Sequence, residues 1–271
     1  MANTILITGS SSGIGKDAAK HFQAKGWNVI ATMRNPDAET ELSALDNVLV
    51  TRLDVQDQAS IDAAVAAGLE RFSTIDVLLN NAGYGAYGLL EATGIDKIQR
   101  QFDVNVTGLL RVTKAVLPHF RANRSGTIVN VSSIGGKMTF PLGTLYHGSK
   151  FAVEGLSEAL HYELEAIGVR VKIVEPGMIK TDFGGRSFDF SNDESLAEYQ
   201  PLVGKFMAAM GAIGTAGSEP SVVSEVIFSA ATDGTSQLRY TAGADAAEYM
   251  KNRKAADDET FIAGMKAQLG L

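Results

Sequence analysis

Three side chains near the middle of the chain have the types and the spacing that proton transfer requires. Tyr146 and Lys150 lie four residues apart at the start of an apolar, helix-like stretch, and Ser133 lies thirteen residues before Tyr146. Four residues make about one helical turn, so the phenol and the ammonium group share one face of the predicted helix. A lysine charge beside a tyrosine favours the phenolate and lowers the phenol pKa. The pattern predicts a tyrosine that exchanges protons near neutral pH.

A glycine-rich turn near the N-terminus has the form of a phosphate-binding site. The β-branched run 4–8 predicts a buried strand, and residues 16–25 predict a helix that ends at Gly26. Between them, residues 9–15 read Gly-Ser-Ser-Ser-Gly-Ile-Gly, which is Gly-x-x-x-Gly-x-Gly spacing rather than Gly-x-Gly-x-x-Gly. Glycines let the backbone approach a pyrophosphate, and a helix N-terminus offers free N–H groups. The pattern favours a dinucleotide site; the alternative is a serine–glycine turn without a ligand.

The composition excludes several kinds of site. The 271 residues are 45% hydrophobic and 20% charged, which fits one α/β domain over residues 1–271. A net charge of −7 without a basic run leaves no electrostatic footprint for nucleic acid. The chain has no cysteine, which excludes disulfides and thiolate chemistry, and we expect no metal site. Its four histidines are expected to be solvated helix residues: His21, His119, His147 and His161.

The chain shows no sign of targeting to a membrane. The first predicted strand begins at Thr4, which leaves no room for a signal peptide. No apolar run reaches the ~18–20 residues that would span a bilayer. We therefore expect a soluble cytoplasmic protein.

Predicted strands and helices alternate along the chain. Strands are expected at 4–8, 27–33, 48–53, 75–79, 127–131, 169–174 and 238–241, and helices at 16–25, 60–72, 104–122 and 145–166. This βαβα order predicts a doubly wound parallel sheet of the Rossmann type, with about seven strands and helices on both faces. Ligands on such sheets bind at the carboxyl ends of the strands. Gly9, Asp54, Asn81, Ser133 and Gly177 all fall at those ends.

Taken together, the motifs resemble the short-chain dehydrogenase/reductase family in its compact single-domain form. They are Thr8-Gly-x-x-x-Gly-Ile-Gly15, Asp54-Val55, Asn80-Asn-Ala-Gly83, Asn105, Ser133, Tyr146-x-x-x-Lys150, and Pro176-Gly177 with Thr181. They occur in the family's order and at its spacing over most of the chain. The residues within these motifs look most similar to those of the hydroxysteroid and retinol dehydrogenase-like branch of the family. The resemblance implies an oxidoreductase that transfers hydride between a nicotinamide cofactor and a ketone or secondary alcohol.

The resemblance implies catalytic roles for four residues. Tyr146 would exchange a proton with the substrate oxygen, and Ser133 would hydrogen-bond to that oxygen. Lys150 would depress the Tyr146 pKa and bind the nicotinamide ribose. Asn105 would kink its helix and hold a water that leads protons to Lys150. Ser132 is a rival for the serine, but the thirteen-residue spacing to the tyrosine matches the family at Ser133.

The resemblance also implies cofactor contacts at the strand ends. The glycine turn would line the phosphates, Asp54 would bond to the adenine amino group beside Val55, and Thr181 would bond to the nicotinamide carboxamide. Residues 81–83 would steady the central strand beneath the ribose. Asp54 could instead cap the turn that follows it. The full expected set is Gly9, Ser11, Ser12, Gly13, Ile14, Gly15, Arg34, Asp54, Val55, Asn81, Ala82, Gly83, Tyr146, Lys150, Pro176, Gly177, Ile179 and Thr181.

The end of the second predicted strand favours NADP(H) over NAD(H). An acidic residue there bonds to the ribose 2′-hydroxyl of NAD, whereas an arginine accommodates the 2′-phosphate of NADP. The chain reads Thr-Met-Arg-Asn at 32–35, with no acid before Asp37. We expect Arg34 to hold the phosphate, with Ser12 nearby. The alternatives are use of NAD(H) and an Arg34 that merely faces solvent.

The substrate end is the least determined part of the sequence. Aromatic and methionine-rich positions predict a pocket for a small hydrophobic ketone or alcohol. The glycine-rich segment 183–216 is expected to be an irregular, mobile lid. Residues 245–271 form a C-terminal extension, helix-like over 246–254 or else a frayed terminus. Candidate wall residues are Tyr84, Tyr87, Met138, Phe140, Leu142, Met178, Phe183, Phe188, Phe190, Tyr199, Phe206 and Met207.

Two other functions on the same fold stay open. A catalytically silent nucleotide-binding regulator would keep the glycine turn but typically loses the tyrosine or the lysine, and both are present here. A dehydratase or epimerase usually needs a longer C-terminal substrate domain. For assembly, the predicted helices 104–122 and 145–166 carry apolar residues on more than one side, which indicates an interface. We expect a homodimer through them, or a homotetramer if the extension leaves the strand at 238–241 free.

Overall fold

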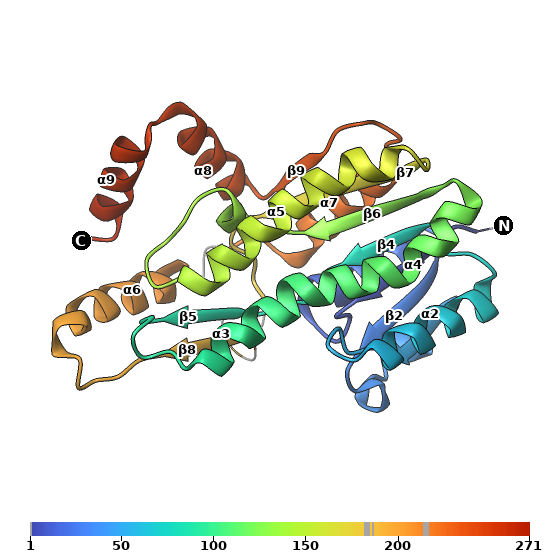
Figure 1. The fold of residues 1–271 in the computed structure, drawn as a ribbon, viewed down its shortest axis with the longest axis horizontal. Helices are drawn as coiled ribbons and strands as arrows, with labels where there is room; N and C mark the ends of the chain where they lie inside the picture. Colours follow the sequence, from blue (N-terminus) through green and yellow to red (C-terminus); the bar gives the residue numbers. More distant parts are fainter. Residues whose placement is uncertain (1, 182–184, 186, 214–216) are drawn as a thin grey trace.

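A seven-stranded parallel sheet forms the centre of the molecule in the computed structural model, which describes residues 2–181, 185, 187–213 and 217–271 (Figure 1). The strand order is β3-β2-β1-β4-β6-β7-β9, and every neighbouring pair is parallel. The order reverses between β1 and β4, which is where ligands bind to doubly wound sheets. The predicted fold class is confirmed. The strands are β1 Thr4–Thr8, β2 Asn28–Met33, β3 Val48–Arg52, β4 Val77–Asn80, β6 Gly126–Val131, β7 Val169–Pro176 and β9 Arg239–Ala242.

Helices cover both faces of this sheet because its strands are apolar on both sides. Along β1, Ile5 and Ile7 belong to the core under α1 and α7, whereas Leu6 belongs to the core under α2 and α4. This alternation follows from the period of two residues along a strand. Figure 1 shows α2, α4 and α5 on the near face of the sheet. The helices are α1 Gly13–Ala24, α2 Gln58–Phe72, α4 Leu109–Asn123, α5 Thr144–Glu165 and α7 Pro220–Thr232.

The predicted helix 104–122 is not one continuous α-helix. A separate helix, α3 (Ile95–Phe102), leads into a π-helical turn at Asp103–Gly108, and only then does α4 begin. A Cβ at Gly108 would lie 2.7 Å from Val55, so this turn packs closely against the loop after β3. Single π turns inside helices occur frequently at functional sites.

The segment 183–216 is more regular than the sequence predicts. In its described part, β8 (Phe188–Ser191) pairs in parallel with β5 (Gly85–Gly88), and α6 spans Gln200–Ile213. This small sheet lies beside α3 and α6 in Figure 1. The expectation of an irregular segment is therefore wrong for these residues, because backbone pairing with β5 orders them. That the segment moves as a lid stays a prediction. The short 3₁₀ turns are Pro36–Ala38, Leu42–Ala44, Ile134–Gly136 and Ala197–Tyr199.

The C-terminal extension folds as two helices, α8 (Ala244–Ala255) and α9 (Asp258–Gln268). From α8, Ala246 and Met250 pack against Ile134 and Met138, which follow β6. The Lys205 ammonium on α6 donates a hydrogen bond to a carbonyl near the end of the chain, that of Gly270. The extension thus contacts the segment that follows β6 and the helix α6. None of the helices in the described parts of the chain is both long and apolar enough to cross a bilayer.

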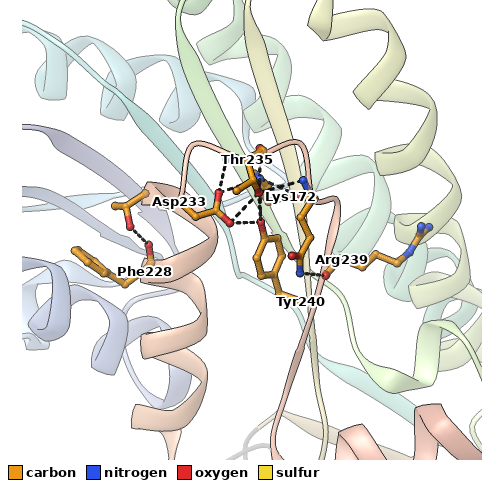
Figure 2. A network of polar contacts seen from close by, with 8 residues as sticks. Lys172, Phe228, Asp233, Thr235, Arg239 and Tyr240 are labelled. Carbon is orange, nitrogen blue, oxygen red and sulfur yellow. Dashed lines mark hydrogen bonds and ion pairs between the residues drawn. The ribbon is translucent and has the colours of Figure 1, made fainter.

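A buried lysine fixes the edge strand β9 (Figure 2). Lys172 is 1% exposed, and its Nζ donates to the carbonyls of Thr235 and Gln237 at 2.7 and 2.9 Å. Nζ also donates to the Tyr240 hydroxyl at 2.9 Å and lies 3.3 Å from Asp233 Oδ1. Burial raises the pKa of Asp233, but the hydrogen bonds it accepts, the Tyr240 hydroxyl's first among them, outweigh burial and hold its pKa at about 2. The buried charge is therefore matched by a carboxylate and by oriented dipoles.

Candidate active site

The structure brings Tyr146, Lys150 and Ser133 together at the carboxyl end of β6. Tyr146 and Lys150 lie on the first two turns of α5, and Lys150 Nζ lies 5.8 Å from the centre of the Tyr146 ring. The same Nζ donates to the Val131 carbonyl at 2.9 Å. Ser133 hydrogen-bonds to Tyr146, and its Oγ accepts the N–H of Gly135 at 3.0 Å. The neighbouring Ser132 has a buried Oγ without a hydrogen-bond partner among the described residues, so Ser133 is the serine that reaches the phenol.

Burial dominates the electrostatics of this cluster. It raises the pKa of Tyr146, and the hydrogen bond with Ser133 lowers that pKa only in part. Burial also lowers the pKa of Lys150 to about 8, against the opposing effect of Glu154. The expectation of a lowered phenol pKa is therefore wrong for this structure. That expectation rests on the lysine charge alone. Desolvation disfavours the charged form of both groups, and here it is the larger effect.

Asn105 lies in the π-helical turn and is 3% exposed. Its Oδ1 accepts the Tyr84 N–H at 3.1 Å, and its Nδ2 donates to the Tyr84 carbonyl at 2.9 Å and to Ser149 Oγ at 3.1 Å. The side chain therefore joins the π turn to the loop after β4 and to α5. The kink expected at this residue takes the form of the π turn. The expected water-holding role stays a prediction.

The glycine turn presents bare backbone at the N-terminus of α1. Gly9 has φ of +74°, which L side chains rarely adopt, and a Cβ at Gly15 would lie 2.5 Å from Asn81 Nδ2. That amide donates to the carbonyls of Thr8 and Gly9 at 3.0 and 3.2 Å. Thr8 Oγ1 accepts the N–H groups of Asn81 and Ala82, both at 3.0 Å. The turn is thus held by these hydrogen bonds, and its three glycines expose their backbone, which fits a pyrophosphate at a helix N-terminus.

One cavity of about 1280 Å³ runs from the glycine turn to Tyr146, Lys150 and Ser133 and beyond them. Of the expected site residues, only Gly15 and Asn105 are not part of its described lining; both lie just behind it. Asp54 also caps the following turn, because its Oδ1 accepts the Gln56 N–H at 3.0 Å. Lining residues from the expected set are Gly9, Ser11, Ser12, Gly13, Ile14, Arg34, Asp54, Val55, Asn81, Ala82, Gly83, Ser133, Tyr146, Lys150, Pro176, Gly177, Ile179 and Thr181.

Two charged residues at the Arg34 end of the cavity were not expected from the sequence. Glu39 and Lys16 both line it, and Lys16 Nζ lies 3.2 Å from Glu39 Oε2. Glu39 Oε1 accepts the N–H groups of Glu41 and Leu42 at 2.8 and 2.9 Å. Burial raises the pKa of Glu39, yet these bonds and Lys16 outweigh burial and lower it. The 3₁₀ turns after β2 bring Glu39 back to the cavity, and no local sequence signal marks such a return.

Aromatic rings form the wall of the cavity next to Tyr146. Tyr87, from β5, stacks on Tyr146 with ring centres 5.2 Å apart, and its ring centre lies 5.2 Å from Phe188 and 6.0 Å from Phe206. Leu269 of the C-terminal extension also lines the cavity, which the sequence did not predict. Lining members of the predicted wall are Tyr84, Tyr87, Phe140, Met178, Phe188, Phe190, Phe206 and Met207.

Three predicted wall residues lie elsewhere. Met138 packs into the apolar cluster with α8, and the Tyr199 hydroxyl donates to Glu91 on the surface. Leu142 lies in a loop with φ of +59° and is not in the described lining. Phe183 falls outside the described residues. The pattern of large apolar residues could not separate cavity wall from neighbouring core, because both need the same side chains.

The expectation that the histidines are solvated is wrong for His147. It follows Tyr146 on α5 and is 3% exposed, because glycines at 135 and 143 leave room for its ring. His119 is also engaged, since its Nε2 accepts the Ile75 N–H at 3.2 Å.

Two buried carboxylates lie behind Lys150. Glu154 and Glu175 are 4% and 2% exposed and share one guanidinium, that of Arg239, whose Nε lies 2.9 Å from Glu154 Oε2 and 3.7 Å from Glu175 Oε1. Burial and then the charge of Glu154 raise the pKa of Glu175 to about 7, although Arg239 opposes them. Between about pH 4.5 and pH 7, the folded protein therefore holds a proton on Glu175 that the unfolded chain has lost.

We expect Glu175→Gln to stabilise the protein at about pH 8 by on the order of 1 kcal/mol and to have little effect at about pH 5. The Glu175 pKa is about 7 in the folded protein and 4.5 in the unfolded chain. As the pH rises from 4.5 through about 7, the unfolded chain loses this proton more readily than the folded protein does. The free energy of unfolding therefore falls, because the folded state must then carry the buried charge. Urea unfolding at both pH values measures this. Glu158→Gln is the matched control on Arg239: hydrogen bonding to Arg239 lowers the Glu158 pKa, so this variant should not stabilise. A pH-independent effect of Glu175→Gln would contradict the assignment.

Comparison with known proteins decides the family. The family model described as short chain dehydrogenase matches residues 3–191. The chain belongs to the short-chain dehydrogenase/reductase family. An uncharacterised oxidoreductase of Schizosaccharomyces pombe is 46% identical over 244 residues, which are 88% of this chain and 100% of that protein. A 3-ketodihydrosphingosine reductase of Bacteroides thetaiotaomicron is 40% identical over 179 residues, 66% of this chain and 65% of that one. The protein is therefore a short-chain dehydrogenase/reductase-type oxidoreductase.

Solved structures of this family share the fold. A short-chain dehydrogenase from Streptomyces avermitilis superposes with a TM-score of 0.82 at 32% identity and covers 100% of this chain and 99% of its own. The structure of ElxO with NADP bound has a TM-score of 0.76 at 26% identity over 92% of this chain and 100% of its own. A 3-ketoacyl-(acyl-carrier-protein) reductase from Brucella melitensis, complexed with NADH, has a TM-score of 0.73 at 25% identity over 89% and 96%.

Proposed function

We propose that this oxidoreductase transfers hydride between NADP(H) and a hydrophobic ketone or secondary alcohol. The observation that carries the proposal is that Tyr146 and Ser133 lie in one cavity, between the bare glycine turn and an aromatic wall. A nicotinamide dinucleotide fits the glycine turn, where Gly9, Gly13 and Gly15 add no side chains of their own, and relatives of this fold hold NADP or NADH. Bound there, the cofactor supplies the hydride.

The chain's own residues would handle the proton. Ser133 orients the substrate oxygen by a hydrogen bond, and Tyr146 donates its phenolic proton to that oxygen during ketone reduction. Alcohol oxidation reverses the transfer. The raised pKa of Tyr146 keeps the phenol protonated, which suits a proton donor. Lys150 lies beside the ring, where we expect it to bind the ribose, and the burial of Tyr146 limits the access of water to the phenol.

The preference for NADP(H) rests on the charges at the far end of the cavity. Arg34 lines that end and supplies positive charge for a 2′-phosphate, whereas the charge of Lys16, which also lines it, is already paired with Glu39 and Glu41. The acid that lines it, Glu39, already accepts two backbone N–H groups and an ion pair, so it is poorly placed to accept a ribose hydroxyl. ElxO, a structural neighbour, holds NADP, while another neighbour holds NADH.

The hydrophobic substrate class rests on the wall formed by Tyr87, Phe188, Phe190 and Phe206. These rings belong to β5, β8 and α6; Tyr87 stacks on Tyr146, Phe188 and Phe206 lie against Tyr87, and Phe190 lies against Phe206. One relative is named a 3-ketodihydrosphingosine reductase, a name that specifies a keto compound as its substrate.

A spectrophotometric screen of NADPH consumption tests the proposed function. The panel should contain ketones of increasing hydrophobicity, and kcat/KM is expected to rise along it. Binding of NADPH without turnover on any ketone would contradict the proposal and indicate a silent nucleotide-binding regulator.

We also propose a homodimer formed through α4 and α5, with the exposed apolar face on α5. Leu109 and Val112 of α4 are buried against the sheet, whereas Phe151 and Tyr162 on α5 are 45% and 71% exposed. A Cβ at Gly155, between them on α5, would meet nothing within 4 Å, so a second helix can approach closely. An exposed apolar face of this kind is typical of a self-complementary interface.

Light scattering at micromolar concentration is expected to give the mass of two chains, and Phe151→Glu is expected to give the mass of one. The added charge would be buried without a partner in the interface. Ile262→Glu is the matched control, because Ile262 is 53% exposed on α9, outside this face. A monomeric wild type would refute the dimer, and a stable tetramer would show that the extension leaves a second interface free.

A further inference from the structure

His147 connects the helix that carries Tyr146 to the loop that carries Ser133. The Phe140 N–H donates to His147 Nε2 at 2.9 Å, and His147 Nδ1 lies 2.9 Å from the Gly135 carbonyl oxygen. The two contacts hold both ends of the 135–140 loop, and Gly135 and Phe140 at these ends line the cavity. Neither Gly135 nor Phe140 is adjacent to His147 in the chain, so the ring fixes the loop to the helix by tertiary contacts alone.

These two contacts determine the protonation of the ring. A backbone N–H can only donate, so Nε2 must be the unprotonated nitrogen that faces Phe140. A carbonyl oxygen can only accept, so the proton lies on Nδ1 and points at Gly135. Burial lowers the pKa of His147, and the hydrogen bond to Gly135 opposes this only in part, which is consistent with a neutral ring.

The ring has no room to adopt another orientation. A Cβ at Gly135 would lie 2.8 Å from Nδ1, and one at Gly143 would collide with the opposite edge of the ring. The ring centre lies 5.7 Å from that of Phe140 and 6.1 Å from that of Tyr87. The two glycines and the histidine therefore fit one another, and a larger residue at either glycine would displace the ring.

A short path of hydrogen bonds leads from this ring to the reaction centre. Gly135 is bonded on both sides: its carbonyl accepts from His147, and its N–H donates to Ser133 Oγ at 3.0 Å. Ser133 in turn hydrogen-bonds to Tyr146, the neighbour of His147 on α5. The four residues form a closed circuit in which the position of the serine hydroxyl relative to the phenol depends on the imidazole.

We propose that His147 is a positioning residue: through Gly135 it holds the Ser133 hydroxyl at the Tyr146 phenol, and through Phe140 it holds the adjoining cavity wall. The inference rests on the proposed oxidoreductase chemistry for its kinetic consequence, but not for its structural one. The histidine touches no reacting atom. It acts by keeping the Ser133 hydroxyl in the position that the reaction needs. A small misplacement of that hydroxyl would slow the reaction.

Three substitutions separate the two contacts. His147→Phe keeps the ring volume and removes both bonds, and we expect it to lower kcat by about tenfold or more while leaving the KM for NADPH within about twofold. His147→Asn places an amide N–H near the Nδ1 position and keeps the Gly135 bond. His147→Gln places an amide oxygen near the Nε2 position and keeps the Phe140 bond. We expect asparagine to recover more of kcat than glutamine, because only the Gly135 bond leads to Ser133.

The matched control is His161→Phe, on the same helix α5 but away from the cavity, and it should keep the wild-type kcat. An unchanged kcat in His147→Phe would overturn the proposal. So would greater recovery by glutamine than by asparagine, since the path through Gly135 would then be wrong. Thermal unfolding of each variant identifies any loss of kcat that comes from loss of fold.

Nitrogen-15 NMR of the wild-type ring provides a test that needs no turnover. Nδ1–H and an unprotonated Nε2 are expected at neutral pH, with His147→Asn used to assign the resonances. A cationic ring or the opposite tautomer would overturn the proposal even if the enzyme is active. A wild type without ketone reductase activity but with the expected tautomer would instead contradict the proposed function and leave the placement of His147 supported.

Discussion

Replacing Tyr146 by phenylalanine is expected to lower kcat for ketone reduction by roughly a thousandfold or more, while the Kd for NADPH changes by no more than about twofold. The substitution removes only the phenolic oxygen, which is the proton donor and the partner of Ser133. The ring stays, so the stack on Tyr87 and the contact beneath Lys150 are retained. Steady-state kinetics with the best ketone of the panel and fluorescence titration of NADPH measure the two effects separately.

Tyr199→Phe is the matched control for this substitution. It also removes one phenolic oxygen, but Tyr199 lies on the surface, where its hydroxyl donates to Glu91. Its kinetics should equal those of wild type. A Tyr146→Phe enzyme with normal kcat would show that the proton comes from elsewhere. Loss of NADPH binding in that variant would show that the hydroxyl serves the cofactor site rather than the chemical step.

The sequence predicted that Tyr146, Lys150 and Ser133 meet, because their relative positions depend largely on local geometry. Helical periodicity places Tyr146 and Lys150 on one face wherever α5 packs. Ser133 follows the end of β6, and the strand and the helix that starts after it must meet at the same edge of the sheet. The doubly wound parallel sheet was predictable for a similar reason, since βαβ units allow only a few topologies.

The parts that the sequence did not predict depend on contacts between distant segments. The pairing of β5 with β8 joins residues about one hundred positions apart through two four-residue strands. No local sequence pattern in either strand identifies the other as its partner. Glu39 reaches the cavity only through two irregular turns after β2. Such placements are decided by tertiary packing, which propensity and periodicity do not encode.

The electrostatic errors have the same origin. A lysine four residues from a tyrosine predicts a lower phenol pKa, but the sign of the shift also depends on how much water the fold removes from both groups. Tyr87 covers Tyr146, and the Val131 carbonyl takes the Lys150 ammonium, so burial prevails. Likewise, a histidine beside the catalytic tyrosine gives no sign of burial until Gly135 and Gly143 are seen on either side of its ring.

The second large effect is expected at the cofactor's 2′ position. Wild type should use NADPH with a higher kcat/KM than NADH, and Arg34→Ala should lower the ratio of the two values by about ten- to hundredfold, the size of a lost charge-assisted contact. Adding Met33→Asp should shift the ratio further towards NADH, because a carboxylate at the end of β2 repels a phosphate and accepts a ribose hydroxyl. Both values come from initial rates with one ketone at fixed concentration.

Arg52→Ala separates this contact from a general effect of positive charge. Arg52 ends the neighbouring strand β3 and pairs with Asp57 at 2.9 Å, outside the lining of the cavity, so its loss should leave the cofactor ratio unchanged. Met33 is 3% exposed and packs in the core, so the double variant also needs a thermal unfolding curve before its rates are compared. An equal or better kcat/KM with NADH in wild type would overturn the assignment. Preference for NADPH that survives Arg34→Ala unchanged would contradict the assignment of the 2′-phosphate to Arg34.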